Sequence, residues 1–240
     1  MDVSINGPKI LFTLPILGGL DITETIVNSW IVIILVFIIC KLLTHKLEKI
    51  PRKRSQQIAE KLVTMIDKLV ATTMGERNKK FAPYILTLFT FSSLGSLISL
   101  LGFRSVTGDI NVTLTWGLMT FLLIWANGLK THGLGYFKGL FEPVFVMFPL
   151  NVISNTAIPV SLAFRHFGNI TAGMIISTLL HGALAAASYA LLRLPIPFLE
   201  IGIPGVLSVY FDVFSGFMQA FIFCMLTMVN VANANEPDEA

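Results

Sequence analysis

The sequence predicts an all-α, polytopic membrane protein with five or six membrane helices and one further amphipathic helix at the membrane interface. Hydrophobic residues make up 54% of the 240 positions. Charged residues make up only 13%, against about 25% in an ordinary soluble domain. Eleven of the 17 lysines and arginines lie between Lys41 and Lys80. A basic block beside apolar runs is typical of the cytoplasmic side of a membrane protein, so nucleic acid is not an expected partner.

Three apolar runs are long enough to cross a membrane as single helices. They cover residues 26–43, 81–103 and 110–129, and their one charged residue is Lys41, near the end of the first run. A membrane-spanning helix needs about 20 mostly apolar residues, and a lysine at a helix end can extend its amine to the interface. We therefore expect each run to be one transmembrane helix.

Two longer apolar runs follow. Residues 139–192 carry only Glu142 and Arg165 as formal charges, and residues 206–235 carry only Asp212. The first of these runs is too long for one perpendicular crossing, so it forms either two closely packed helices or a pair of long tilted segments. Three prolines are expected to bend or interrupt its first half: Pro143, Pro149 and Pro159.

Basic residues in short loops predict the orientation of the chain. The loop after the first run is basic, and so is the loop around Lys130 and Lys138, so both are expected in the cytoplasm. By alternation, the N-terminal segment 1–25 lies outside and the acidic tail 236–240 lies inside. The N-terminal segment resembles a cleaved signal peptide only weakly because its start is acidic where a basic start is expected.

Residues 55–73 have the pattern of an amphipathic helix. Ile58 and Leu62 fall on one side of the helix, and Glu60 and Asp67 fall on the other. This pattern predicts an interfacial helix on the cytoplasmic surface. Packing of the same helix against a protein partner is the alternative, and the sequence does not decide between them.

The most informative residue is Arg165, because a charge at the centre of a membrane helix costs about 2.5–3.5 kcal/mol to insert. It lies 23 residues after Glu142 and 28 before Arg193, near neither end of its run. The helical face around it holds small and polar residues: Ser161, Arg165, Gly168, Asn169, Ala172 and Ile176. Small residues allow another helix to come close. The sequence thus predicts a permanent positive charge facing a partner, with a structural ion pair to Asp212 as the alternative.

The last apolar run repeats this arrangement with an acid. Asp212, Gly216 and Gln219 lie at offsets 0, 4 and 7, on one helical face. Because a carboxylate can take up and release a proton, Asp212 is a candidate relay group, and simple exposure to water at a helix end is the alternative. The cysteines and histidines have no spacing that predicts a metal site or a disulfide framework.

Three motifs in these runs resemble those of one family. Residues 159–169, PVSLAFRHFGN, resemble the signature of subunit a of the F-type ATP synthase, the stator subunit beside the rotating c-ring. Residues 109–115, DINVTLT, are similar to the segment entering that family's fourth helix, and residues 219–227, QAFIFCMLT, are similar to its last helix. The three motifs occur in family order across more than half of the chain.

The resemblance implies two offset half-channels for protons or sodium ions, in ion-path helices at residues 139–235. It also implies that the run at residues 139–192 forms two long, strongly tilted helices against the c-ring. In the family, the arginine at Arg165 separates the half-channels and helps the ring carboxylate to release its ion. The residues at Asn169 and Gln219 line the same region. This chain departs from the family pattern, which has ionisable residues at four positions: Ser154, Asn155, Ile158 and Met174. Asp212 is then the main titratable candidate of the outer half-channel.

We therefore expect a single integral membrane domain, residues 1–240, that is the ion-translocating stator of a rotary ATP synthase and couples proton, or sodium, flow to ring rotation. It is expected to catalyse no reaction itself and to need no metal or other cofactor. Its expected partners are c-ring proteolipids, peripheral-stalk b subunits, the rest of the complex and the lipid of the cell inner (plasma) membrane. The rival interpretation is a stand-alone secondary transporter or channel in which Arg165 binds an anionic substrate. The internal repeats common in such transporters are not found in the sequence.

Overall fold

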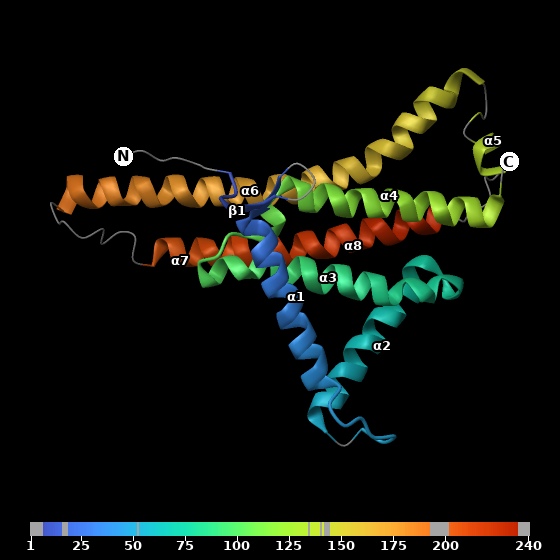
Figure 1. Ribbon diagram of the computed structural model, residues 1–240, viewed down its shortest axis with the longest axis horizontal. Helices are drawn as coiled ribbons and strands as arrows, with labels where there is room; N and C mark the ends of the chain where they lie inside the picture. Colours follow the sequence, from blue (N-terminus) through green and yellow to red (C-terminus); the bar gives the residue numbers. More distant parts are fainter. Residues whose placement is uncertain are drawn as a thin grey trace. The chain divides into compact units, whose positions relative to one another are not determined.

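The computed structural model describes residues 7–15, 19–51, 53–133, 135–139, 141, 145–192 and 202–234. Nearly all of these residues are helical (Figure 1). They form two compact units, each of which is described by itself. The first unit contains Met1–Ile34, Phe91–Asp109 and His166–Ala220, and the second contains Leu35–Thr90, Ile110–Arg165 and Phe221–Ala240.

Five segments of the described chain are long and apolar enough to cross a membrane, which agrees with the predicted five or six. Two of them are single helices, α1 (Glu24–Leu43) and α4 (Ile110–His132). Another consists of the 3-10 turn η1 (Glu76–Phe81), helix α3 (Ala82–Leu97) and the 3-10 turn η2 (Ile98–Leu101). The last consists of the end of α7 (Ile203–Ser208), the π-helix η6 (Val209–Ser215) and helix α8 (Gly216–Asn233). The architecture is that of an all-α, polytopic membrane protein.

The longest apolar run forms one helix. Helix α6 (Phe148–Leu192) has 45 residues and follows the 3-10 turn η4 (Phe145–Met147), so the expectation that this run divides into two helices is wrong. The helix continues through Pro159 because a proline in a membrane helix removes one backbone hydrogen bond that neighbouring groups can replace. At about 1.5 Å per residue, α6 is about 68 Å long, roughly twice the thickness of the hydrocarbon layer. A strong tilt therefore stays the prediction for this helix.

A β-hairpin that the sequence did not predict precedes α1. Strands β1 (Ile10–Leu14) and β2 (Leu20–Thr23) pair antiparallel. The backbone N–H of Glu24 donates to the carbonyl oxygen of Lys9 at 2.9 Å, which links the hairpin to the first turn of α1. Strands of four or five residues are too short for alternation to distinguish them from an irregular segment.

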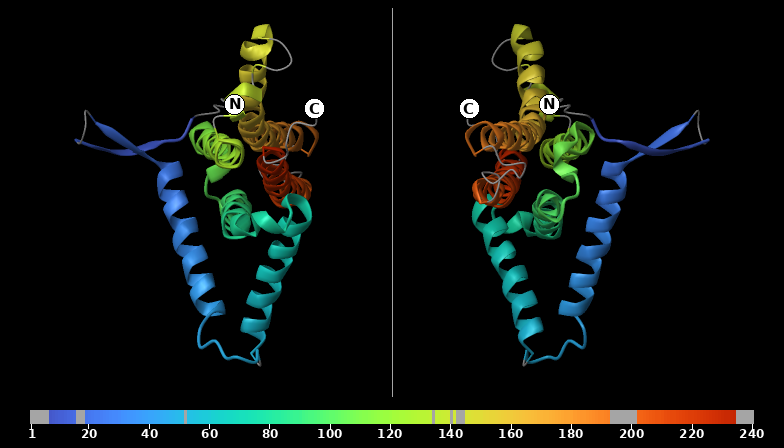
Figure 2. Two further views of the ribbon diagram at one scale, coloured as in Figure 1. Left: turned by 90° about the vertical axis from the view of Figure 1, so that its right-hand side faces the viewer. Right: turned by 90° about the vertical axis from the view of Figure 1, so that its left-hand side faces the viewer.

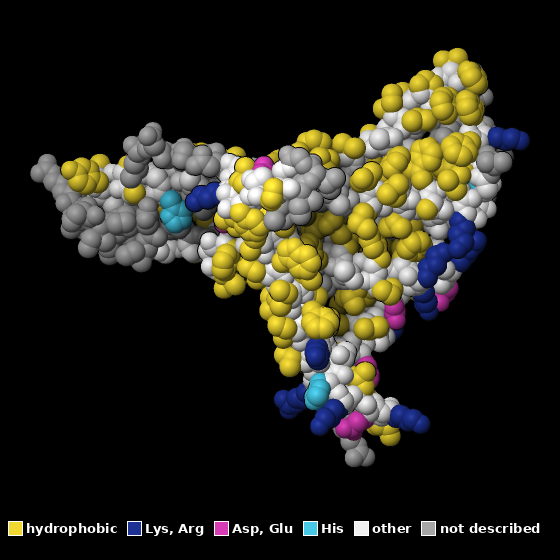
Figure 3. Space-filling model, viewed as in Figure 1, with side chains coloured by type: hydrophobic (Ala, Val, Ile, Leu, Met, Phe, Trp, Pro, Cys, Tyr) yellow, Lys and Arg dark blue, Asp and Glu magenta, His cyan; other side chains and the backbone are white. Residues whose placement is uncertain are grey.

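The amphipathic pattern at residues 55–73 is confirmed as a helix, α2 (Arg54–Met74). Val70 is fully buried, whereas Ile58 and Leu62 are 52% and 41% exposed. Basic side chains gather around the turn between α1 and α2, as Figure 3 shows. The cytoplasmic placement of this turn stays a prediction.

Several residues named above lie outside the described residues: Arg52, Glu142, Pro143, Arg193 and the tail 236–240.

Close helix packing holds the second unit together. Figures 1 and 2 show α4 and α8 side by side, and the Asn127 side chain of α4 donates to the Val231 carbonyl of α8 at 3.0 Å. Gly117 lets α4 approach α6, because a Cβ at this position would lie 2.8 Å from the Pro159 carbonyl oxygen and 3.1 Å from the Cβ of Ala163. Glycines and amides are therefore used here as in other membrane bundles, for close approach and for bonds between helices.

Candidate functional site

Arg165 lies on α6 in the second unit with an exposed side chain. A cavity of about 440 Å³ opens beside it, between α6 and α8. The residues that line this cavity are Ser154, Ala157, Ile158, Ser161, Leu162, Arg165, Leu226 and Asn230. Within its own unit, no described carboxylate forms an ion pair with Arg165. The guanidinium thus reaches a partly polar cavity while its charge remains uncompensated by this part of the chain.

The predicted face of small and polar residues is an exposed face of α6. Ser161, Gly168 and Ala172 are exposed on the same side as Arg165, and Ala157 continues the row toward the start of the helix. Such short side chains let a second helix approach the backbone closely. This face therefore differs from the exposed surface of α4, where large side chains such as Leu122 lie.

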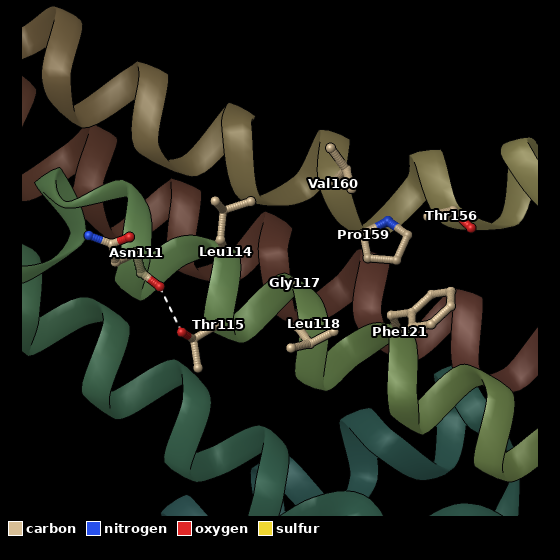
Figure 4. Close-up of a pocket in the computed structure, with 9 residues that line it drawn as sticks. All are labelled: Asn111, Leu114, Thr115, Gly117, Leu118, Phe121, Thr156, Pro159 and Val160. Atoms are coloured by element: carbon tan, nitrogen blue, oxygen red, sulfur yellow. Dashed lines mark hydrogen bonds between the residues drawn. The ribbon is translucent and has the colours of Figure 1, made fainter. Parts of the chain in front are cut away.

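A second cavity, of about 450 Å³, lies between α4 and α6 (Figure 4). Its lining is mainly apolar, and no charged residue is among the residues that line it. The hydroxyl of Thr115 donates to the Asn111 carbonyl of the same helix at 2.7 Å, so this polar group is satisfied within α4. Because its lining is mainly apolar and uncharged, we do not assign this cavity to the ion path.

The other three predicted site residues lie in the first unit. Asn169, one turn beyond Arg165 on α6, donates from Nδ2 to the hydroxyl of Ser215 at 2.5 Å. Gln219, one turn beyond Ser215, is only 7% exposed. Gly216 lies between Ser215 and Gln219 in the sequence. A Cβ atom added at Gly216 would be only 2.8 Å from the Cβ of Ser96. Small residues therefore bring α8 close to α3 at the level of these amides.

Asp212 lies within the π-helix η6 and is half-buried. The hydroxyl of Ser99, in the 3-10 turn η2, lies near its carboxyl group and donates to the carbonyl oxygen of Ser96 at 2.7 Å. π-helical turns interrupt the regular hydrogen-bond pattern of an α-helix and often occur at functional sites. Asp212 is thus half-buried within a helical segment, and its role as a relay group stays a prediction.

Sequence reasoning missed a group of hydroxyls in the same unit. The Oγ1 atom of Thr107 lies 2.9 Å from Ser96 Oγ and 2.9 Å from Ser105 Oγ, and all three residues are buried. The available signal was the spacing of Ser92, Ser96 and Ser99, which places them on one face of the second span. A serine in a membrane helix often bonds to its own backbone, so the spacing alone did not single them out.

The chemistry of these groups suits the passage of an ion or a proton. Among the residues that the structure describes, no three His, Cys, Asp or Glu side chains lie together as a possible metal-binding group. The groups in the first unit are hydroxyls, amides and carboxylates, among them Asp212 and the buried Asp109, and their oxygen atoms are of the type that binds protons or alkali cations.

Comparison with known proteins distinguishes between a stator subunit of an ATP synthase and a stand-alone transporter or channel. The sequence profile of the ATP synthase A chain family matches residues 26–232. The chain belongs to this family. The sodium ion specific ATP synthase subunit a of Propionigenium modestum is 33% identical to it, over 95% of this chain and 84% of the relative. ATP synthase subunit a of Desulfotalea psychrophila is 35% identical over 87% of this chain and 82% of the relative. That of Moorella thermoacetica is 32% identical over 90% and 93%.

Membership of the ATP synthase A chain family identifies the general role. The chain is a multi-pass membrane protein of the ATP synthase complex, and it is the ion-translocating stator subunit of the membrane sector. A stand-alone transporter for an anionic substrate is not favoured, because relatives over nearly the whole chain are named as ATP synthase subunits.

Proposed function

We propose that Arg165 separates two offset half-channels and that a ring of proteolipid c subunits supplies the carboxylate that moves past it. The observation that carries this proposal is the exposed guanidinium beside the polar cavity of the second unit, on the face of α6 with small side chains. Ser161 and Ala172 leave room for a neighbouring helix, so a carboxylate on that helix can come within ion-pairing distance.

The fixed charge of Arg165 would couple ion flow to ring rotation. A ring carboxylate that pairs with the guanidinium must have released its ion before it passes, and it binds a new ion afterwards. Because a guanidinium stays protonated at physiological pH, Arg165 also repels other cations and blocks a direct leak between the half-channels. One charge moved across 100 mV is worth about 2.3 kcal/mol, so several transfers together can drive ATP synthesis elsewhere in the complex.

The inner half-channel is assigned to the cavity beside Arg165. Its polar lining includes Ser154 near the start of α6 and Asn230 near the end of α8. The start of α6 follows the basic loop around Lys138, and α8 precedes the acidic tail, so both ends are on the predicted cytoplasmic side. Ions would therefore pass between the ring and the cytoplasm through this cavity.

The outer half-channel is assigned to Asp212, with Asn169 and Gln219 as further residues of the path. Asp212 can hold and release a proton, and its half-buried position in the π-helix η6 supports this assignment. The transported ion is a proton in the simplest case. Sodium is the alternative, because the relative from Propionigenium modestum is sodium ion specific, and a comparison of pumping with and without sodium distinguishes the two.

The remaining assignments follow from this role. The chain acts as one integral membrane domain in the cell inner (plasma) membrane, with its N-terminus outside and its C-terminus in the cytoplasm. It hydrolyses no nucleotide itself, and peripheral-stalk b subunits hold it against the ring. The uneven placement of basic residues supports this orientation.

The test is the Arg165→Ala variant in inverted membrane vesicles. ATP-driven ion pumping, measured by dye quenching, should be abolished, while an immunoblot shows the subunit at its normal level. Lys138→Ala, which removes a positive charge from the loop and not from the path, should pump normally. Both variants should copurify with a small, two-helix proteolipid that carries a carboxylate. Normal pumping by Arg165→Ala would disprove the role of this residue, and solute transport by the isolated chain would support the rival class.

A further inference from the structure

His166 follows Arg165 directly but lies on a different face of α6. Its imidazole is fully buried in the first unit, with Nε2 3.3 Å from the hydroxyl oxygen of Ser92 on α3. Ser92 is itself only 1% exposed. Neighbouring residues in an α-helix are about 100° apart around the axis. When His166 points toward Ser92, the side chain of Arg165 therefore points about 100° away from that contact.

The bond between these two side chains resists rotation of α6 about its axis. A buried imidazole that loses its polar partner is left in apolar surroundings, which is unfavourable. In the first unit α6 also forms the hydrogen bond from Asn169 to Ser215, whereas the contacts of Ile170 and Met174 against Gly108 are van der Waals contacts and depend little on direction. Of the described bonds between α6 and other elements, the bond from His166 to Ser92 is the one nearest to Arg165 in the sequence.

Small rotations of α6 would matter for the charge it carries. A rotation of about 30° moves a side-chain tip at a helix surface by about 3 Å. An ion pair needs its atoms within hydrogen-bonding distance, and misplacement of a reacting group by about 1 Å can lower a rate about a hundredfold. The direction of Arg165 must therefore be held by contacts on the buried side of the helix.

We propose that His166, held by Ser92, sets the rotation of α6 and thereby the direction in which Arg165 faces the passing carboxylate. This inference rests on the proposed function of Arg165. His166 is a positioning residue, since it acts through Arg165 and contacts neither the ion nor the partner.

The first measurement is ATP-driven pumping in inverted vesicles. His166→Leu and Ser92→Ala should each lower the pumping rate about five- to tenfold at normal subunit levels, because both remove the same bond. The double variant should be no slower than the slower single variant. His166→Gln keeps a nitrogen that can reach Ser92 and should stay within about twofold of the wild type. Ser93→Ala is the matched control, since Ser93 is also buried but its hydroxyl has no hydrogen-bond partner among the described residues.

The second measurement detects rotation and separates it from a loss of stability. Single cysteines at Ala172 and at Phe164, in a chain without its two native cysteines, are cross-linked to a cysteine on the carboxylate-bearing helix of the proteolipid. Ala172 lies two turns from Arg165 on the same face, and Phe164 lies about 100° away. His166→Leu should change the ratio of the two yields at least about twofold, whereas a merely unstable subunit lowers both yields together.

Normal pumping with an unchanged cross-linking ratio in Ser92→Ala and His166→Leu would overturn the inference. A double variant whose loss equals the product of the two single losses would do the same. If His166→Leu fails to accumulate, Ser92→Ala alone decides. These outcomes leave the proposed function intact, because that function fails only if Arg165→Ala pumps normally in the same vesicles.

Discussion

The two units of the chain hold their ionisable residues in different surroundings. In the second unit, Arg165 is exposed beside a cavity whose other polar lining residues are uncharged: Ser154, Ser161 and Asn230. In the first unit, Asp212 is half-buried, and a buried group of hydroxyls lies in the same unit. A guanidinium cannot give up its proton at physiological pH, whereas a carboxylate can. The first arrangement suits a barrier, and the second suits a group that accepts and passes an ion.

The largest effect on this difference between the two units is expected when the charge of Asp212 is removed. Asp212→Asn preserves the size and polarity of the side chain, but it cannot ionise. We expect ATP-driven pumping to fall at least about tenfold while the melting temperature stays within about 2 °C of the wild type. Asp212→Glu, which retains a carboxylate, is the control and should keep more of the activity. Normal pumping by Asp212→Asn would reduce Asp212 to a polar surface group.

A smaller effect is expected from filling the cavity beside Arg165. Ala157→Phe places a large apolar side chain in the lining of the proposed inner half-channel, and we expect pumping to slow about three- to fivefold with little change in melting temperature. Leu122→Phe is the matched control, because Leu122 is 56% exposed on α4 and lines neither described cavity. Equal pumping by the two variants would place the ion path elsewhere.

The smallest effect concerns the buried hydroxyls of the first unit. Thr107→Val keeps the shape of the side chain but removes the oxygen that lies 2.9 Å from Ser96 Oγ and Ser105 Oγ. We expect a loss of about 1–2 kcal/mol in unfolding free energy and a melting temperature about 2–8 °C lower, with pumping nearly unchanged. Thr115→Val, which removes a hydroxyl bonded only within α4, should melt at the wild-type temperature. If both variants have the same melting temperature, the hydrogen bonds of the Thr107 hydroxyl contribute nothing to stability.

The membrane helices could be predicted because apolar length is a local property of the sequence. The run at residues 139–192 was wrongly expected to divide, because the sequence shows where Pro159 weakens a helix but not whether neighbouring groups replace the lost bond. The helix that carries the face around Arg165 was predicted correctly, since residues on one face of one helix are determined by their spacing, whereas the partner of this face stays a prediction. The hydroxyl group around Thr107 was missed because Ser105 and Thr107 lie in the connection between α3 and α4. The position of this connection against Ser96 depends on tertiary packing and not on a local sequence pattern.

By itself, the sequence determined that this chain is a membrane protein, which runs can cross the bilayer, and where its one central cation lies. These properties depend on apolar length and on a helical period of a few residues. Only the tertiary structure decided that His166 meets Ser92, 74 positions away, and that Asn169 meets Ser215, 46 positions away. It also decided the π-helical turn around Asp212. Such contacts join residues far apart in the chain, and no local pattern specifies them before the helices pack.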